Sequence, residues 1–224
     1  MKRLCALFLC LCFLAVPVGA EEDTKYVALT FDDGPSGRFT ERLLDGLLER
    51  EVKATFLLCG YRIEQYPGLT QRIFDEGHEI GLHGYSHKCM SQMCRADLER
   101  ELNDTAQLLP EGCSPAFLRP PGGEANDLVS QIARERGLAI LNWSVDPMDW
   151  NTSKTQQIEQ AVLKTVKDGD IILLHDMSDS SVEAALYIVD TLQNQGFRFV
   201  TVSQLAQIRD ETIQPGKTYS RFAP

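Results

Sequence analysis

Short apolar runs alternate with longer amphipathic stretches along almost the whole of this 224-residue chain. Such alternation is typical of repeated strand and helix units, whose strands run parallel in one sheet. Residues 182–195 illustrate the helical pattern, because apolar side chains recur there at three- and four-residue steps. Strands are expected at residues 26–31, 54–59, 79–82, 116–118, 138–143, 170–174 and 197–200. Helices are expected at residues 40–50, 69–76, 95–109, 127–136, 155–167, 182–195 and 203–209.

Periodicity alone does not separate an open parallel sheet from a barrel, but the positions of the reactive side chains favour a barrel. These side chains follow the expected strands directly, and in a barrel all parallel strands end at the same rim. We therefore expect an α/β fold, a distorted (β/α) barrel of about seven parallel strands. The tail, residues 211–224, is expected to be an irregular surface segment. The side chains brought together would be Asp32, Asp33, His83, His87, Arg119, Asp146, Asp149 and His175.

The first twenty residues have the layout of a secretory signal peptide. Lys2 and Arg3 precede an apolar stretch, residues 4–16, and small residues stand at the expected cleavage point after Ala20. The apolar stretch is shorter than the ~20 residues that a membrane-spanning helix needs, although an uncleaved N-terminal anchor is the alternative. We expect residues 1–20 to be removed and residues 21–224 to form one domain, because that length suits a single core. The working protein is then secreted or associated with the cell envelope.

The charge balance restricts the class of partner. The chain carries 22 basic and 32 acidic residues, a formal net charge of −10, and cleavage after Ala20 would remove two of the basic residues. An acidic surface argues against nucleic acid and against anionic lipid as partners. We expect a monomer with no membrane partner beyond an uncleaved anchor, and the charge leaves an uncharged glycan open as substrate.

Four cysteines remain after residue 20, and in an oxidising compartment an even number permits disulfides. Cys89 and Cys94 are close enough in sequence to bridge a short loop, but pairing cannot be read from sequence, so this bridge stays open. A zinc site made of cysteines is disfavoured because no C-x-x-C spacing is present. The four are Cys59, Cys89, Cys94 and Cys113.

Two short segments have residue types that suit metal chemistry. His83 and His87 are four residues apart, so a turn could present both imidazoles on one side to a divalent metal. Asp32 and Asp33 end an expected strand, where one carboxylate could complete a His2Asp site and the other could take a proton from water. In isolation, surface histidines and an Asp-Asp-Gly turn are the alternatives.

Five segments, in their order along the chain, resemble the motifs of the NodB-type polysaccharide deacetylases, carbohydrate esterase family four. The resemblance covers nearly all of residues 21–224. It implies a NodB-homology domain and a metal-dependent hydrolase that removes N-acetyl groups from N-acetylglucosamine or N-acetylmuramic acid units of a polysaccharide such as peptidoglycan or chitin oligomers. An O-acetyl ester deacetylase of the acetyl-xylan type and a non-catalytic glycan-binding domain are the alternatives. The segments are Thr30 to Gly34, His83 to His87, Arg119 to Gly123, Asp146 to Trp150 and Leu173 to His175.

The resemblance also assigns roles to individual residues. Asp32 would be the catalytic base, oriented by Arg119, and His175 would protonate the leaving amine, supported most plausibly by Asp149. One divalent ion would be held by Asp33, His83 and His87; Zn2+ is expected, with Co2+, Mn2+ or Ni2+ as alternatives. The substrate would be contacted by Gly122, Trp150, Leu173 and Asp146.

Two positions depart from the family pattern. The family usually has Ser or Thr where Gly84 stands, and the hydroxyl steadies the loop, so this loop is expected to be less tightly held. It usually has Tyr where Gly122 stands, so the site is expected to be wider.

Overall fold

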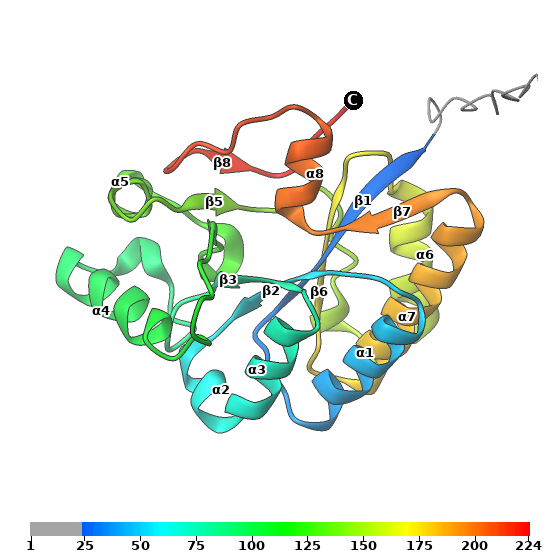
Figure 1. Cartoon of the computed structure of the whole chain (residues 1–224), viewed down its shortest axis with the longest axis horizontal. Helices are drawn as coiled ribbons and strands as arrows, with labels where there is room; N and C mark the ends of the chain where they lie inside the picture. Colours follow the sequence, from blue (N-terminus) through cyan, green and yellow to red (C-terminus); the bar gives the residue numbers. More distant parts are fainter. Residues whose placement is uncertain (1–23) are drawn as a thin grey trace, which may run out of the picture.

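The computed structural model describes residues 24–224, and the expected signal peptide lies outside these residues. The described chain is a curled, largely parallel sheet with helices packed around it (Figure 1). All seven expected strands are present, and their order in the sheet is β6-β1-β2-β3-β4-β5-β8, with β7 paired to the first half of β1. The strands are β1 (Lys25–Asp32), β2 (Thr55–Leu58), β3 (Glu79–Leu82), β4 (Phe117–Leu118), β5 (Ala139–Leu141), β6 (Ile171–His175), β7 (Phe197–Val200) and β8 (Thr218–Tyr219).

The two ends of this sheet meet only through isolated bridges. Val145, which follows β5, bridges Ile172 of β6, and Arg221, which follows β8, bridges Asp170. The barrel is therefore distorted: a continuous parallel ladder covers most of its circumference and single bridges close the remainder. This confirms the (β/α) barrel of about seven parallel strands.

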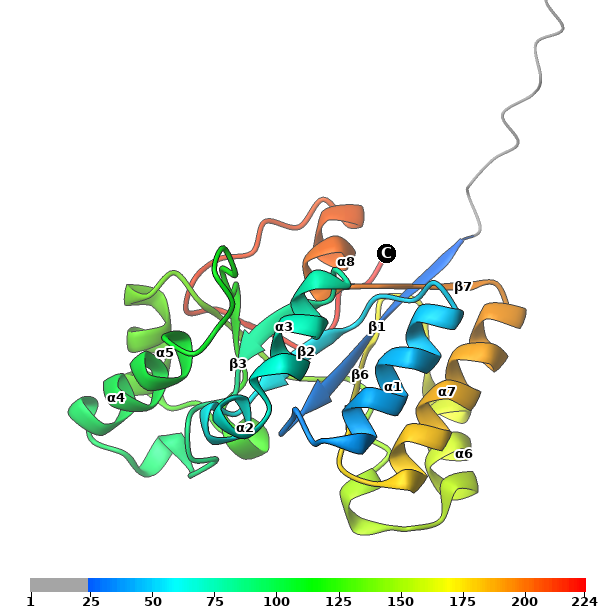
Figure 2. The ribbon, with the colours of Figure 1, turned by 60° about the horizontal axis from the view of Figure 1, so that its bottom comes forward.

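The helices lie mostly outside the sheet, with α1, α6 and α7 grouped on one flank and α4 and α5 on the other (Figure 2). The seven expected helices are present within a few residues of their expected ends. The helices are α1 (Arg38–Glu49), α2 (Gly60–Gln65), α3 (Pro67–Asp75), α4 (Arg95–Ala106), α5 (Asp127–Glu135), α6 (Thr155–Thr165), α7 (Asp179–Asn194) and α8 (Val202–Ile208). Three short 3-10 helices are η1 (Met90–Gln92), η2 (Pro121–Gly123) and η3 (Asp149–Asn151).

Besides the 3-10 helices, one α-helix and one strand of the described chain were not expected from the sequence. Helix α2 has six residues, of which only Gly60 and Ile63 are buried, so no helical period can show. Strand β8 has two residues, pairs with β5 and buries Tyr219, so the prediction of an irregular tail was wrong over this segment. Strand β8 pairs with β5, which is distant in the sequence, and two residues are too few to show an alternation of apolar and polar side chains.

Strand β1 shows how the fold positions the site. Val27, Leu29 and Phe31 belong to the core between the sheet and helices such as α1 and α7. The alternate face carries Ala28, packed with Leu57 and Phe117 inside the barrel, and then Thr30 and Asp32 further along the strand. The interior therefore changes from apolar to polar toward the carboxyl ends of the strands, where Asp32 lies.

The opposite rim holds both ends of the described chain. Strand β1 begins there at Lys25, and Phe222 N donates to Gly169 O (2.8 Å), just before β6 begins. The C-terminal end and the start of β1 accordingly lie on the same side of the molecule (Figures 1 and 2). Across residues 24–224, every helix is too short or too polar to span a lipid bilayer.

The cysteines at 59, 89, 94 and 113 are free thiols in the structure. Helix η1 lies between Cys89 and Cys94, and their thiols have different partners: Cys89 Sγ contacts Ser91 Oγ (3.2 Å) and Cys94 Sγ contacts Asp97 Oδ2 (3.1 Å). The candidate Cys89–Cys94 bridge is therefore not formed.

Candidate active site

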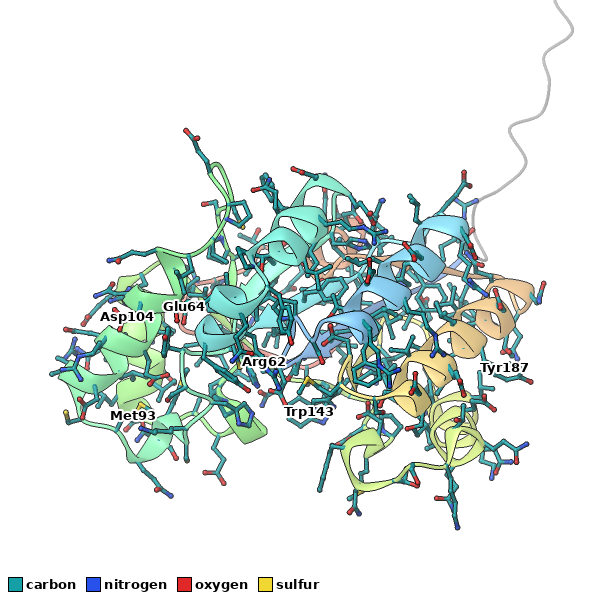
Figure 3. The ribbon with its side chains drawn as sticks, turned by 90° about the horizontal axis from the view of Figure 1, so that it is seen from below. Arg62, Glu64, Met93, Asp104, Trp143 and Tyr187 are labelled. Carbon is teal, nitrogen blue, oxygen red and sulfur yellow. The ribbon has the colours of Figure 1, made fainter. Side chains whose placement is uncertain are left out.

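A pocket of about 460 Å³ opens at the carboxyl ends of the strands, the face seen in Figure 3. Most of the residues predicted for the site contribute to its walls, although they come from separate strands and loops. Arg119 and Asp149 lie behind the wall: both are buried, and each contacts a residue that lines the pocket. The lining residues are Asp32, Asp33, His83, His87, Gly122, Trp143, Asp146, Trp150, Leu173 and His175.

Three of these side chains converge tightly. Asp33 Oδ1 lies 3.2 Å from His83 Nε2 and 3.1 Å from His87 Nε2, and the candidate ligand atoms of the three residues all lie within 4.8 Å of one another. Asp33 Oδ1 is buried and has no aligned hydrogen-bond donor among the described residues. One carboxylate oxygen and two imidazole nitrogens directed at a common point form a donor set that fits a divalent cation such as Zn2+.

Neighbouring groups fix the orientation of His83 and the charge of Asp33. His83 Nδ1–H donates to the carbonyl oxygen of Arg119 (2.6 Å), which leaves the Nε2 lone pair directed at Asp33. Burial would raise the pKa of Asp33, but the imidazoles of His83 and His87 beside it hold that pKa well below its usual range. Asp33 is therefore ionised at neutral pH.

Asp32 is held by an arginine that is completely buried. Arg119 Nη1 donates to Asp32 Oδ1 (2.6 Å) and to Thr30 Oγ1 (2.9 Å). The other guanidinium nitrogens are also used: Nε donates to Leu141 O (3.1 Å) and Nη2 to Asn142 O (3.0 Å). Because the buried charge is paired and its donors are satisfied, the guanidinium has one orientation, and so does the carboxylate bound to it. The second oxygen, Asp32 Oδ2, lies 3.8 Å from His83 Nε2.

His175 is paired with Asp149 on the other side of the pocket. Asp149 Oδ2 accepts from the His175 backbone N–H (2.8 Å), and Asp149 Oδ1 accepts from Nδ1–H (2.7 Å). Burial alone would lower the pKa of His175, but the hydrogen bond and charge of Asp149, with the charges of Asp32 and Asp33, raise it to about 9. His175 is therefore a cation at neutral pH.

The other acid of this motif has a local role. Asp146 Oδ1 accepts from the Met148 N–H (2.8 Å) and so shapes the turn that leads into η3. The residues alone left both acids open as the partner of His175, the resemblance favoured Asp149, and in the structure it is Asp149 that contacts the ring.

The remaining walls are apolar or open. Leu173 is buried at the pocket floor, while the Trp150 side chain is 63% exposed and stands at the edge. Gly122 has a φ of 72°, and a Cβ built there would meet no atom within 4 Å, so space is open where the family usually has a tyrosine. Trp143 was missed because the sequence placed it at the end of an expected strand; it follows β5 and lies toward the middle of the face shown in Figure 3.

A second cavity of about 530 Å³ adjoins this pocket and shares Asp33, Trp150 and His175 with it. Its other walls are mainly hydroxyl and amide side chains, which the sequence did not indicate. These walls are formed by Asn151, Thr152, Ser153, Met177, Ser178, Ser180 and Ser181, with Asp149 behind His175.

The chain matches known proteins over most of its length. Residues 19–141 match the family model described as polysaccharide deacetylase. A peptidoglycan-N-acetylglucosamine deacetylase of Bacillus cereus is 38% identical over 191 residues, which cover 83% of this chain and 90% of the relative. The peptidoglycan-N-acetylmuramic acid deacetylase PdaC of Bacillus subtilis is 34% identical over 193 residues, which cover 85% of this chain and 41% of that longer protein.

A solved structure is similarly close. The family 4 acetyl xylan esterase of Clostridium thermocellum, in complex with a cobalt ion, superposes with a TM-score of 0.82 at 33% identity, over 88% of this chain and 98% of that one. Family model, relatives and fold agree. The chain belongs to the polysaccharide deacetylase family.

Proposed function

We propose that this protein hydrolyses N-acetyl groups on N-acetylglucosamine or N-acetylmuramic acid units of a polysaccharide, with peptidoglycan or chitin oligomers as substrate. The observation that carries the proposal is a single pocket with the Asp33, His83 and His87 trio and the Arg119-bound Asp32 on one side, and His175 paired with Asp149 on the other. Relatives named as peptidoglycan and chitooligosaccharide deacetylases support the substrate class.

In this proposal Asp33, His83 and His87 hold one divalent ion, which when bound lowers the pKa of a water and polarises the acetyl carbonyl. Zn2+ is the proposed ion because its preferred donors are imidazole nitrogen and carboxylate oxygen; Co2+, Mn2+ and Ni2+ accept the same donors. The buried, unpaired Asp33 Oδ1 supports a cation at this point.

The chain's own groups would then move the protons. Asp32 Oδ2 takes the proton of the attacking water, since Oδ1 is engaged by Arg119, which keeps the carboxylate charged and oriented. The backbone N–H of Gly122 stabilises the developing oxyanion. His175 Nε2 gives its proton to the leaving nitrogen, while Nδ1–H stays bound to Asp149.

The pair His175 and Asp149 predicts a pH dependence. We expect the rate of the parent protein to fall as pH rises through about 9, where His175 loses its proton. Asp149→Asn removes the charge that offsets burial, so the pKa of His175 falls and the alkaline limb moves to lower pH. A pH profile of kcat/KM measures this, with Asp146→Asn as the matched control. An alkaline limb at the same pH in Asp149→Asn and in the parent would contradict the assignment of His175.

Removal of an O-acetyl group is the second candidate, because the Clostridium thermocellum neighbour is an acetyl xylan esterase. The raised pKa of His175 favours the amide, whose nitrogen must be protonated to leave.

The second cavity supports a polymeric substrate. Its neutral hydroxyl-rich walls and the exposed Trp150 at the shared edge suit a neighbouring sugar ring of the same chain. We also propose that the protein is a monomer, that residues 1–20 direct its export and are cleaved off after Ala20, and that residues 21–224 form the deacetylase domain of a secreted or envelope-associated protein.

Acetate release tests this function. Penta-N-acetylchitopentaose, a peptidoglycan digest and acetylated xylan are offered to the purified protein before metal stripping, after stripping, and after Zn2+ is restored. We expect release from an N-acetylated glycan that is lost on stripping and returns with Zn2+. Release from acetylated xylan alone would favour the ester reading, and no release from any substrate by protein with bound metal would favour a non-catalytic glycan-binding domain.

A further inference from the structure

We propose that Glu101 of α4 is a positioning residue for the metal site, because its carboxylate fixes the loop that carries His87. The inference rests on the proposed function, in which His83 and His87 bind the metal. No motif of the sequence indicated Glu101, which lies in the middle of an amphipathic helix.

The loop between β3 and η1 has two backbone N–H groups, those of Tyr85 and Ser86, that donate to a side chain and not to a backbone carbonyl. Tyr85 N–H donates to Glu101 Oε2 (2.7 Å), and Ser86 N–H donates to the same oxygen (2.8 Å). Ser86 Oγ–H donates to Glu101 Oε1 (2.6 Å). One carboxylate therefore accepts three hydrogen bonds from two consecutive residues, and bonds to a charged acceptor are about twice as strong as neutral ones.

The carbonyl groups of the same loop are held from the other side. Gly60 N–H, at the start of α2, donates to Gly84 O (2.9 Å), and Tyr61 N–H donates to Tyr85 O (3.1 Å). The loop is thus clamped between α2 and α4, with its acceptors satisfied by one helix and its donors by the other.

Gly84 makes the close approach of Glu101 workable. Its φ of 80° is a conformation that side chains disfavour, and a Cβ there would lie 2.6 Å from Met90 Cε and 3.2 Å from Glu101 Oε2. The expectation that this glycine leaves the loop loosely held was wrong, because Glu101 anchors the loop where the family usually uses a hydroxyl.

The two histidines depend on the loop to different degrees. His83 is buried, continues directly from β3, and is fixed by its bond to the Arg119 carbonyl. His87 lies at the far end of the loop with a φ of 57°, its side chain is 43% exposed, and Asp33 is its one polar partner among the described residues. The position of His87 Nε2 is therefore set by the loop backbone, and through it by Glu101.

The test is the affinity of the full-length protein for Zn2+, measured by competition with a chromophoric chelator. Removing a group that orients a metal ligand typically weakens metal affinity by about 10- to 100-fold, which is our expectation for Glu101→Ala. Glu101→Gln keeps an acceptor without the charge, so a smaller loss is expected. Glu99→Ala is the matched control, because Glu99 lies on the same helix and its carboxylate pairs with Arg95 instead (3.0 Å).

Two further measurements separate positioning from a general loss of structure. Thermal unfolding of the metal-stripped proteins shows whether each variant folds. If Glu101→Ala does not fold, the single variants Glu101→Gln and Ser86→Ala are used for the test in its place. We also expect kcat/KM of Glu101→Gln to rise toward the parent value as Zn2+ is raised to saturation, which a purely structural defect would not show.

Folded Glu101 variants that bind Zn2+ as tightly as the parent and Glu99→Ala would overturn the inference. That result leaves the proposed function intact if the parent binds Zn2+ and releases acetate. A parent that does neither would instead remove the proposed function, and this inference with it.

Discussion

Asp32→Asn is expected to retain the metal and lose about 100- to 10,000-fold in kcat, the contribution typical of a general base. Asparagine has nearly the shape of aspartate and can still accept from Arg119, but it cannot take a proton from water. Asp32 is not one of the three converging ligands, so metal content should be unchanged. Initial rates of acetate release and metal analysis of the same purified sample measure the two quantities.

The substitution also removes the negative charge that faces Arg119, which is 0% exposed. Leaving a buried charge uncompensated costs about 3 to 5 kcal/mol when the partner is removed, and asparagine should cost less because the hydrogen bond survives. Thermal unfolding therefore accompanies the rates. An undiminished rate in folded Asp32→Asn would refute Asp32 as the base, and loss of metal would indicate that it serves as a ligand.

Asp33→Ala is expected to abolish metal retention, and with it detectable turnover. The substitution removes the only carboxylate of the trio and the charge that draws a cation between the two imidazoles. Removing a residue that only orients a metal ligand already weakens metal affinity by about 10- to 100-fold. Removing a ligand itself should therefore weaken metal affinity by more than about 100-fold. Metal analysis after gel filtration and chelator competition are the measurements.

A second consequence separates loss of the ligand from general damage. The Asp33 carboxylate beside the ring is the main reason that the pKa of His87 is raised, so this pKa should fall in the variant, which NMR titration of the metal-stripped protein can follow. Asp104→Ala is a suitable control, because Asp104 is exposed on α4, well away from Trp143 in Figure 3. An Asp33→Ala protein that keeps a stoichiometric ion would show that the metal is bound elsewhere.

The strands were predictable from the sequence because a strand that is buried on both faces of the sheet consists mainly of consecutive apolar residues, as in β1 and β6. The members of the site were predictable because the reactive side chains follow those runs, and a barrel brings the ends of its strands together. Asp32, His83 and His175 each come directly at the end of a strand or just after it.

What could not be predicted depends on contacts between distant segments. The residues alone did not separate Asp149 from Asp146 as partner of His175, and only the resemblance favoured Asp149; the turn before η3 directs one carboxylate to Met148 and the other to the imidazole. Trp143 looked like the end of a strand, and Glu101 looked like any polar residue of an amphipathic helix. Their roles arise from neighbours in other segments of the chain, Tyr85 for Glu101 and Asp32 for Trp143, and no local pattern records them.

The placement of the chain ends has a practical consequence for how the protein can be used. Because Lys25 and Phe222 lie at the rim opposite the pocket, a tether joined at either end would leave the catalytic face directed away from the support. A protein fixed to a bead or a wall in this way could still bind a long insoluble polymer, because the polymer would not have to enter the space between the protein and its support.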